Sequence, residues 1–262
     1  MQNGTINREP ATLSAMFNHG TRVTPPTADR VPAFPRRLKE FAPRKGFITD
    51  AQYAKLAASS TKTLWLRALV ACAYSFGFRK GALLNLRARQ VDLLDHWIEL
   101  EGDGTKNGEA RKIPMTAEVF ELLKACLRGK KSEDFVFTRE DGEDGGRVVD
   151  PRDDWYNLCV ASELGAYVSA KRKIGDDFNR YVGLNLRDFR RSAIRNMTRR
   201  GVNDKTAMRI SGHKTFSVFQ RYNIVDEADL VEASKRIERG GQVSASQIES
   251  DAKPDTSKLA VS

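Results

Sequence analysis

The sequence has few of the residues that most often build metal sites and disulfide frameworks. Its 262 residues include three cysteines and three histidines, namely Cys72, Cys126, Cys159, His19, His96 and His213. The cysteines lie far apart and form no CxxC pair, so we expect reduced core thiols rather than a disulfide framework or a thiolate zinc site. No two histidines share a ligand spacing, which argues against a metal-dependent nuclease. We expect neither a metal nor another cofactor.

Long apolar segments are also missing. The longest, residues 69–74, is far shorter than the roughly 20 residues that span a bilayer. The first residues, MQNGTINREPATL, lack the basic start and apolar stretch of a secretory signal. Apolar residues make up 40% of the chain and charged residues 30%, which is typical of a soluble globular protein. We therefore expect a cytoplasmic protein with no membrane partner.

The glycine-rich segment GDGTKNG, residues 102–108, does not have the GxxxxGK[ST] order of a nucleotide-binding P-loop. Its Asn107-Gly108 pair instead favours a tight hairpin turn. The flanking segments WIEL and RKIPM then form two short strands of a small antiparallel sheet.

Positive charge is concentrated in one segment. The chain carries a net charge of +10, and residues 171–222 account for all of it, with 14 basic and 4 acidic residues. Neutralised phosphates release counterions, so a confined basic surface is what binding to a polyanion requires. A basic, solvent-exposed helix without a partner is the alternative.

The sequence divides into three parts. Within residues 1–45 we expect one helix, over 4–22, followed by a proline-rich linker. Residues 46–238 predict an α+β domain that is mostly α, with a small antiparallel β-sheet, and residues 239–262 predict a disordered tail. A capping box at Thr49–Gln52 begins a helix, and Gly81 interrupts the chain before a short helical turn. Further helices are expected over 61–76, 117–127, 151–164, 186–200, 204–210, 216–223 and 227–237, and a short strand over 134–138.

Residues 186–200 predict an amphipathic helix with an unusual arginine pattern. Its apolar stripe lies on one side, and Arg187, Arg191, Arg195 and Arg199 repeat at i, i+4 on another. Arg190 lies between the two stripes, where packing would hold its planar fork in place for a bidentate grip on phosphate. Pairing with a core carboxylate is the alternative.

Four segments together resemble the tyrosine recombinase (phage integrase) family, in the same order and over nearly the whole chain. They are GFRKGALLNLRARQVDL, TKNGEARKIPM, LRDFRRSAIRNM and SGHKTFSVFQRYNIVDEADL. The resemblance implies that two arginines, a hairpin lysine, a histidine and a tyrosine nucleophile act in catalysis. These positions are Arg79, Lys106, Arg190, His213 and Tyr222, and further DNA contacts are expected from Arg187, Arg191 and Lys214.

The resemblance implies a site-specific recombinase that cleaves and rejoins double-stranded DNA through a 3′-phosphotyrosine, as a homotetramer on DNA. The chemistry suits these residue types. Arginines can hold the charge that builds on the non-bridging phosphate oxygens, and Lys106 at a hairpin tip can protonate the departing 5′ hydroxyl. The phosphotyrosine keeps the energy of the phosphoester for rejoining, so neither a metal nor ATP is needed.

The chain departs from the family pattern in three ways. Arg187 stands where the family usually has histidine or lysine, and Ala82 stands where an acidic residue is common. Positioning of Arg79 or Arg190 is therefore expected to rely on another carboxylate. The family also has a helical core-binding domain ahead of the catalytic domain, and only residues 5–20 resemble its end, so we expect a truncated gene product or fragment that binds DNA loosely.

Three other functions are compatible with the sequence. Type IB topoisomerases share the chemistry, although the motif spacing is closer to that of integrases. The segment TAMRISGHKTFSVFQRY has the small-residue and turn pattern of a helix-turn-helix regulator. A degenerate recombinase that binds DNA without cutting it is the third, because of Arg187 and Ala82. Arg79, Lys106 and Tyr222 argue against a pure DNA-binding protein, which has no need of them. A test for DNA cleavage, rather than for DNA binding, distinguishes the alternatives.

Overall fold

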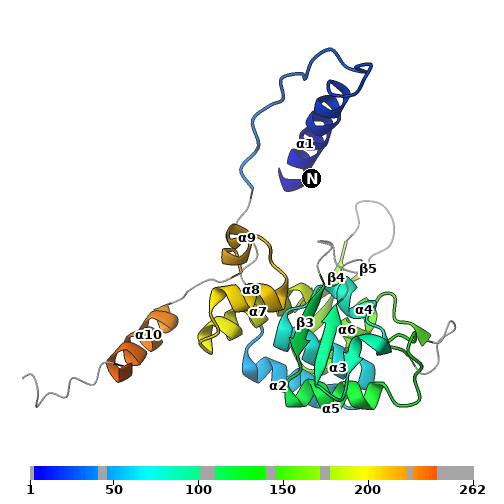
Figure 1. The fold of residues 1–262 in the computed structure, drawn as a ribbon, viewed down its shortest axis with the longest axis vertical. Coiled ribbons are helices and arrows are strands. Elements are labelled where there is room, and N and C mark those ends of the chain that lie inside the picture. The colour runs from blue at the N-terminus through cyan, green and yellow to red at the C-terminus, as the bar shows by residue number, and fades with distance from the viewer. Residues whose placement is uncertain are drawn as a thin grey trace, which may run out of the picture. The chain divides into compact units, whose positions relative to one another are not determined.

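The computed structural model describes residues 3–40, 46–100, 110–139, 146–171, 178–222 and 227–240. Contacts divide the chain into two compact units, residues 1–45 and 46–262. Figure 1 shows the order of their helices and strands. In the part that the structure describes, no helix combines the length and apolarity needed to cross a membrane.

The first unit is one helix with an extended segment packed back along it. Helix α1 spans Asn3–Gly20 and contains Pro10. Asn7 is buried and holds the returning chain, because its side-chain amide donates to Leu38 O and its side-chain oxygen accepts from Leu38 N, both at 2.8 Å. The helix predicted over 4–22 is therefore present, and the proline-rich residues after it contain neither helix nor strand among those described.

The second unit is built around one buried helix, α3. Helix α2 spans Asp50–Ser59 and α3 spans Leu64–Phe76; ten of the residues of α3 are buried. The predicted capping box is present, since Gln52 N donates to the Thr49 hydroxyl and Thr49 N to the Gln52 side chain. Helix α5, Ala117–Cys126, and helix α7, Leu186–Arg199, both pack on α3.

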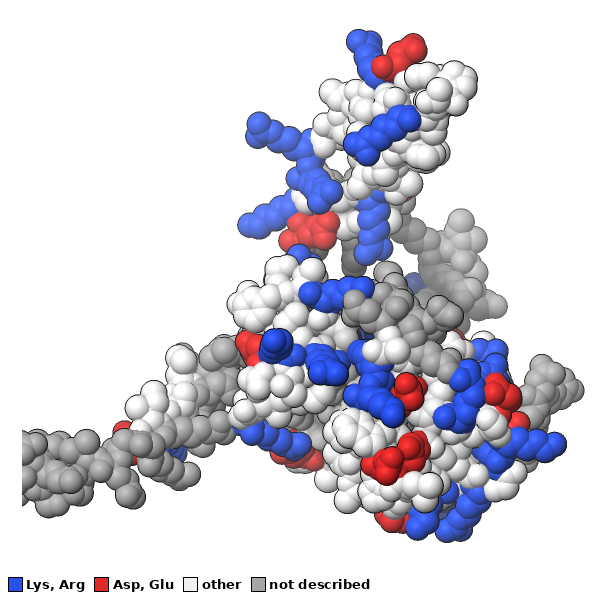
Figure 2. Space-filling model, viewed as in Figure 1, with Lys and Arg blue, Asp and Glu red and all other residues white. Residues whose placement is uncertain are grey.

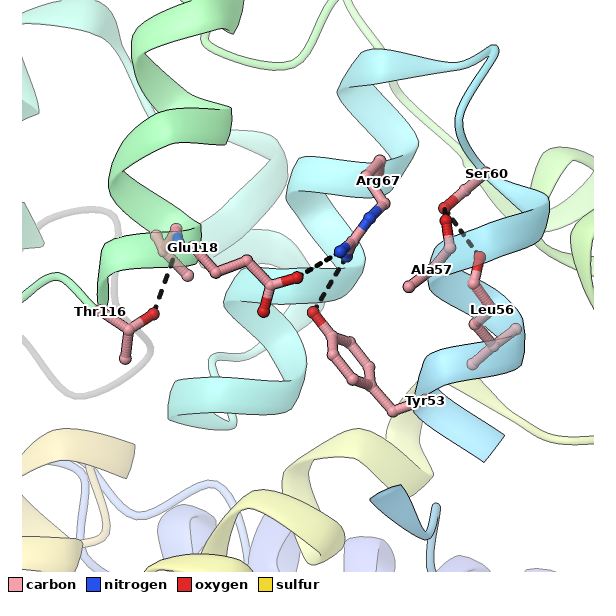
Figure 3. A network of polar contacts seen from close by, with 8 residues as sticks. Tyr53, Leu56, Ala57, Ser60, Arg67, Thr116 and Glu118 are labelled. Carbon is pink, nitrogen blue, oxygen red and sulfur yellow. Dashed lines mark hydrogen bonds and ion pairs between the residues drawn. The ribbon is translucent and has the colours of Figure 1, made fainter. Parts of the chain in front are cut away.

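A polar network ties the first helices of this unit together (Figure 3). Arg67 on α3 donates to the Tyr53 hydroxyl on α2 at 2.9 Å and forms an ion pair with Glu118 on α5. Thr116 caps the start of α5 by accepting from Val119 N. Charged and hydroxyl groups at the core edge thus fix how α2 and α5 sit on α3.

A three-stranded antiparallel sheet, in the order β1-β2-β3, completes this side of the unit. Strand β1 is Val91–Asp92, β2 is Trp97–Leu100 and β3 is Arg111–Pro114, with Ile98 paired to Ile113. This confirms the expected small antiparallel sheet. The predicted hairpin turn, with Lys106, lies outside the described residues.

The remaining elements run toward the C-terminus. They are α4, Lys80–Leu84; a 3-10 helix, Ala88–Gln90; α6, Arg152–Ala161; β4, Gly165–Ala170; β5, Phe178–Gly183; α8, Asp204–Ser211; α9, Phe216–Gln220; and α10, Glu227–Gly240. Residues 241–262, most of the predicted tail, lie outside the described part. All three cysteines are buried and free, as predicted.

Three predictions from the sequence were wrong. Residues 165–183, for which no strand was predicted, contain the antiparallel pair β4–β5. Residues 134–138 make only isolated bridges instead of a strand, because the Lys130 ammonium donates to Phe135 O and Val136 O. Gly81 lies inside α4 rather than breaking the chain before it.

Candidate active site

A small second core sets the position of the C-terminal helices. Ala193, Ile194 and Met197 on α7 pack with Ala207 on α8 and Phe219 on α9, and Tyr222 rests against this cluster. The apolar stripe of α7 is shared between this cluster and the main core. Burial of these side chains therefore fixes both the arginine face of α7 and the half-buried tyrosine after α9.

A cleft of about 800 Å³ lies beside α7. Six of its lining residues are basic and one is acidic: Arg79, Lys80, Arg152, Arg187, Arg190, Arg191 and Asp150. Asp150 is engaged by Lys80 at 3.5 Å and Arg152 at 3.0 Å. Figure 2 shows that Lys and Arg outnumber Asp and Glu on the face in view. The excess positive charge makes the cleft suitable for an anion.

Arg190 is held in this cleft by main-chain carbonyls. Its guanidinium donates to Gly77 O at 2.6 Å and to Ser211 O at 2.7 Å. Gly77 ends α3 with a φ of 64°, and a Cβ there would lie 3.0 Å from the Ala193 Cβ and 3.3 Å from the Arg190 Cα. Glycine at position 77 thus lets the end of α3 lie close enough to α7 for the Gly77 carbonyl to accept from Arg190.

Arg79 lies immediately before α4 and donates to Gly212 O at 3.3 Å. Within the described residues, the hydrogen-bond partners of Arg79 and Arg190 are carbonyls and an imidazole rather than a carboxylate. The expected carboxylate is therefore replaced by carbonyls, which position a guanidinium without cancelling its charge. Ala82, the departure noted in the sequence, is half-buried in α4.

His213 lies behind Arg190 and next to Tyr222. The Ser211 hydroxyl donates to Ala207 O at 2.7 Å, so it accepts from His213 Nδ1 at 2.8 Å. This places the proton on Nδ1, so Nε2 is the acceptor for Arg190, whose Nη2 lies 3.0 Å from Nε2 and 3.2 Å from Nδ1. The His213 and Tyr222 rings are 5.1 Å apart between centroids. His213 therefore orients Arg190 and packs against the tyrosine ring.

Burial and neighbouring cations set the charge state of these groups. Burial, with the charges of Arg190, Arg79 and Arg111, lowers the pKa of His213 to about 3, so the imidazole is neutral at pH 7. Burial, with Arg79 and Arg111, lowers the pKa of Arg190 to about 9, which leaves it charged at pH 7. The site thus presents fixed guanidinium charges beside a neutral imidazole.

The neutral state of His213 has a measurable consequence for stability. Its folded pKa lies below the ordinary value of about 6.5, so the unfolded chain gains a proton first as the pH falls. The contribution of the neutral His213 to the free energy of unfolding is therefore full above about pH 6.5 and is lost as the pH falls toward 3. We expect the melting temperature of the wild type, relative to that of His213→Gln, to fall by about 4–8 °C between pH 7.5 and pH 5. A difference that stays constant over this range contradicts a neutral His213.

The structure brings most of the predicted residues together. Arg79, Arg187, Arg190, Arg191 and Tyr222 line one cleft, with His213 in contact with two of them. Arg187 is exposed at its edge. Lys214 instead lines a neighbouring hollow of about 720 Å³ with Lys205 and Arg209.

Two features of this region were not found from the sequence. Arg111 and Ser211 contact the site, and the only signals for them were the neighbouring motifs RKIPM and SGH.

The alternative of a helix-turn-helix is disfavoured, because α9 has five residues and is too short to lie along a major groove. No group of three or more potential metal-ligating side chains was found among the described residues.

The chain is similar to proteins that act on DNA. The phage integrase family model matches residues 47–229. The tyrosine recombinase XerA of Saccharolobus solfataricus is 27% identical over 154 residues, which is 59% of this chain and 44% of that protein. The chain thus spans less than half the length of this curated relative.

Solved structures share the fold. The Tn1549 transposon integrase in complex with a circular intermediate DNA has a TM-score of 0.65 at 17% identity, covering 90% of this chain and 80% of that chain. A lambda integrase tetramer bound to a Holliday junction has a TM-score of 0.54 at 19% identity, covering 80% and 58%. The family match, over residues 47–229, includes the residues that line the cleft and the helices α7, α8 and α9.

Proposed function

Because the chain belongs to the phage integrase family, we propose that it is a site-specific DNA recombinase, with Tyr222 as its nucleophile. The observation that carries this proposal is that Arg79, Arg190 and Tyr222 line the same basic cleft. Double-stranded DNA is the proposed substrate, in keeping with the DNA complexes of the Tn1549 and lambda integrases.

The two arginines act on the phosphate. A phosphodiester under attack gains charge on its non-bridging oxygens, and donors fixed in advance stabilise that charge without having to reorganise. Arg190 is fixed by two carbonyls and His213, and Arg79 by Gly212 O. Neither charge is neutralised by a carboxylate in the described part of the site, so both are available to the DNA.

The covalent step exchanges one phosphoester for another. The Tyr222 hydroxyl gives up its proton, for which we propose water as the acceptor, and its oxygen forms a bond to phosphorus while the bond to the 5′ oxygen breaks. The departing 5′ oxygen takes a proton, for which we propose the Lys106 ammonium as donor, and leaves as a hydroxyl. Attack by a 5′ hydroxyl on the phosphotyrosine reverses the exchange and rejoins a strand. The number of phosphoester bonds is conserved, so no external energy source is required.

The surrounding basic residues are proposed to grip the DNA backbone. Arg187 and Arg191 line the cleft beside the two catalytic arginines, and Lys214 extends the basic surface beyond it. Contacts of these residues with phosphates would give an affinity for DNA that falls steeply with salt.

We propose that residues 46–238 form the catalytic domain, and that residues 1–45 are the end of a core-binding helix with its linker.

Helix α10 is proposed to mediate assembly on DNA as a homotetramer, as in the lambda integrase tetramer on a Holliday junction. Its apolar residues Leu230, Val231 and Ile237 are 63%, 55% and 75% exposed, so they are available to a second copy.

Deleting residues 226–262 should therefore leave the melting temperature of the monomer within about 2 °C. It should also abolish multimers on DNA in sedimentation experiments. The point substitution Leu230→Glu should act in the same direction, with Lys235→Glu on the same helix as the control. Unchanged multimers in the deletion variant contradict this role for α10.

The proposed function is tested by covalent trapping. The full chain is incubated with a pool of nicked duplexes that covers the DNA on both sides of its gene, and complexes are denatured in SDS. A nick near the cleavage point lets a short strand diffuse away and prevents rejoining. We expect a protein–DNA adduct that survives SDS. DNA binding without any adduct would instead support a degenerate recombinase that binds DNA without cutting it.

A further inference from the structure

Three consecutive carbonyls at the end of α8 each accept a hydrogen bond from a different arginine. Ile210 O accepts from Arg111 at 3.1 Å, Ser211 O from Arg190 at 2.7 Å, and Gly212 O from Arg79 at 3.3 Å. The last carbonyls of a helix have no partner within it and form the negative end of its dipole. The C-terminus of α8 therefore gathers three guanidinium groups that would otherwise repel one another.

Arg111 is the member of this set with no proposed role. It lies at the start of β3, far in sequence from the helices that carry the other two arginines. It contacts the turn at residues 210–212 and is not among the residues that line the cleft. Its contact with Ile210 O thus connects the sheet to the turn that presents carbonyls to Arg79 and Arg190.

Gly212 shows how closely Arg111 packs against this turn. Gly212 ends α8 in the left-handed conformation, with a φ of 72°. A Cβ added there would overlap the guanidinium of Arg111. Arg111 therefore occupies the space that a side chain at position 212 would fill. This position directly precedes His213.

The charge of Arg111 also reaches the site. It is one of the cations that lower the pKa of His213, after burial, Arg190 and Arg79, and it lowers that of Arg190. Removing it changes the electrostatic environment of both groups even where the fold is retained.

We infer that Arg111 is a positioning residue of the strand-cleavage reaction, which fixes the turn at residues 210–212 so that Arg79, Arg190 and His213 stay directed at one phosphate. This inference rests on the proposed recombinase function. Arg111 acts through the turn and does not itself contact the reacting phosphate.

The test is a double-mutant cycle with Gly212, using single-turnover adduct formation at saturating protein. Arg111→Ala removes the guanidinium, and Gly212→Ala displaces it. Each should lower the rate by about 10- to 100-fold, in the range of other residues that orient catalytic groups, with DNA affinity nearly unchanged. Both changes remove the same contact, and Gly212→Ala also strains a left-handed position, so the double variant should be slowed by much less than the product of the two single effects.

Two further variants separate positioning from a general loss of charge or fold. Arg111→Lys retains a donor for Ile210 O and should recover most of the rate. Lys112→Ala, the exposed neighbour on β3, removes the same charge and should react at the wild-type rate. Effects of Arg111→Ala and Gly212→Ala that multiply, or a rate unchanged in Arg111→Ala, would overturn the inference.

A measurement without DNA keeps the inference distinct from the proposed function. The imidazole of His213 is titrated by NMR in the full chain, and Arg111→Ala should shift its titration to higher pH, whereas Lys112→Ala should not. An adduct that fails to form in the wild type counts against the proposed function, while an unchanged His213 titration in Arg111→Ala counts against the role of Arg111.

Discussion

Replacing Arg190 by glutamine is expected to lower the rate of adduct formation at least about 1,000-fold, the largest effect of any single arginine. The guanidinium of Arg190 is held in place before DNA binds, because it donates to Gly77 O and Ser211 O. Glutamine removes the charge and is too short to meet both carbonyls. The loss should appear in the rate at saturating protein, because the interaction matters most in the transition state.

The same substitution should also destabilise the protein. Two buried carbonyls lose their donors, and each such loss typically costs about 1–3 kcal/mol. Arg190→Lys should restore part of the stability but little of the rate, since an ammonium lacks the planar fork. Arg200→Gln, which removes the same charge from an exposed position at the end of α7, is the matched control and should react nearly as the wild type. A comparable loss in Arg200→Gln would mean that bulk charge, not geometry, explains the effect.

Replacing Tyr222 by phenylalanine is expected to abolish the adduct altogether. The ring stays against the cluster of Ala193, Phe219 and their neighbours, so folding and DNA affinity should be unchanged. The substitution removes a single oxygen, the atom proposed to form the bond to phosphorus.

Tyr156 provides a matched control for this substitution. It is a second tyrosine in the same cleft, and its ring stacks on Tyr181 at 3.9 Å rather than on His213. Tyr156→Phe should therefore form the adduct at nearly the wild-type rate. An adduct that persists in Tyr222→Phe would assign the nucleophile to another residue.

Local signals in the sequence were sufficient to predict much of the helical part of the fold. The Thr49–Gln52 capping box and the apolar stripe of α7 depend on residues within a few positions of one another, so they could be recognised without the structure. The β4–β5 hairpin could not. Its strands are mostly exposed and show no apolar alternation, and a Cβ at Gly165 or Gly183 would overlap the Tyr181 side chain.

The same limit applies to the site. Resemblance to a family named the residues that we propose for the chemistry, but it could not show what holds them. The groups that position Arg79 and Arg190 are carbonyls of Gly77, Ser211 and Gly212. Every residue has a carbonyl, so no pattern of side chains marks these, and a carboxylate was expected in their place. Arg111 reaches the same turn from 99 residues away in sequence, which only the fold makes visible.

The identity of the residue joined to DNA tests the central claim most directly. Adduct from the wild type is digested with nuclease and protease, and the peptide that carries the residual nucleotide is sequenced by mass spectrometry. The account predicts a nucleotide attached through a 3′ phosphate to Tyr222. Attachment to a different residue, or through a 5′ phosphate, would contradict it.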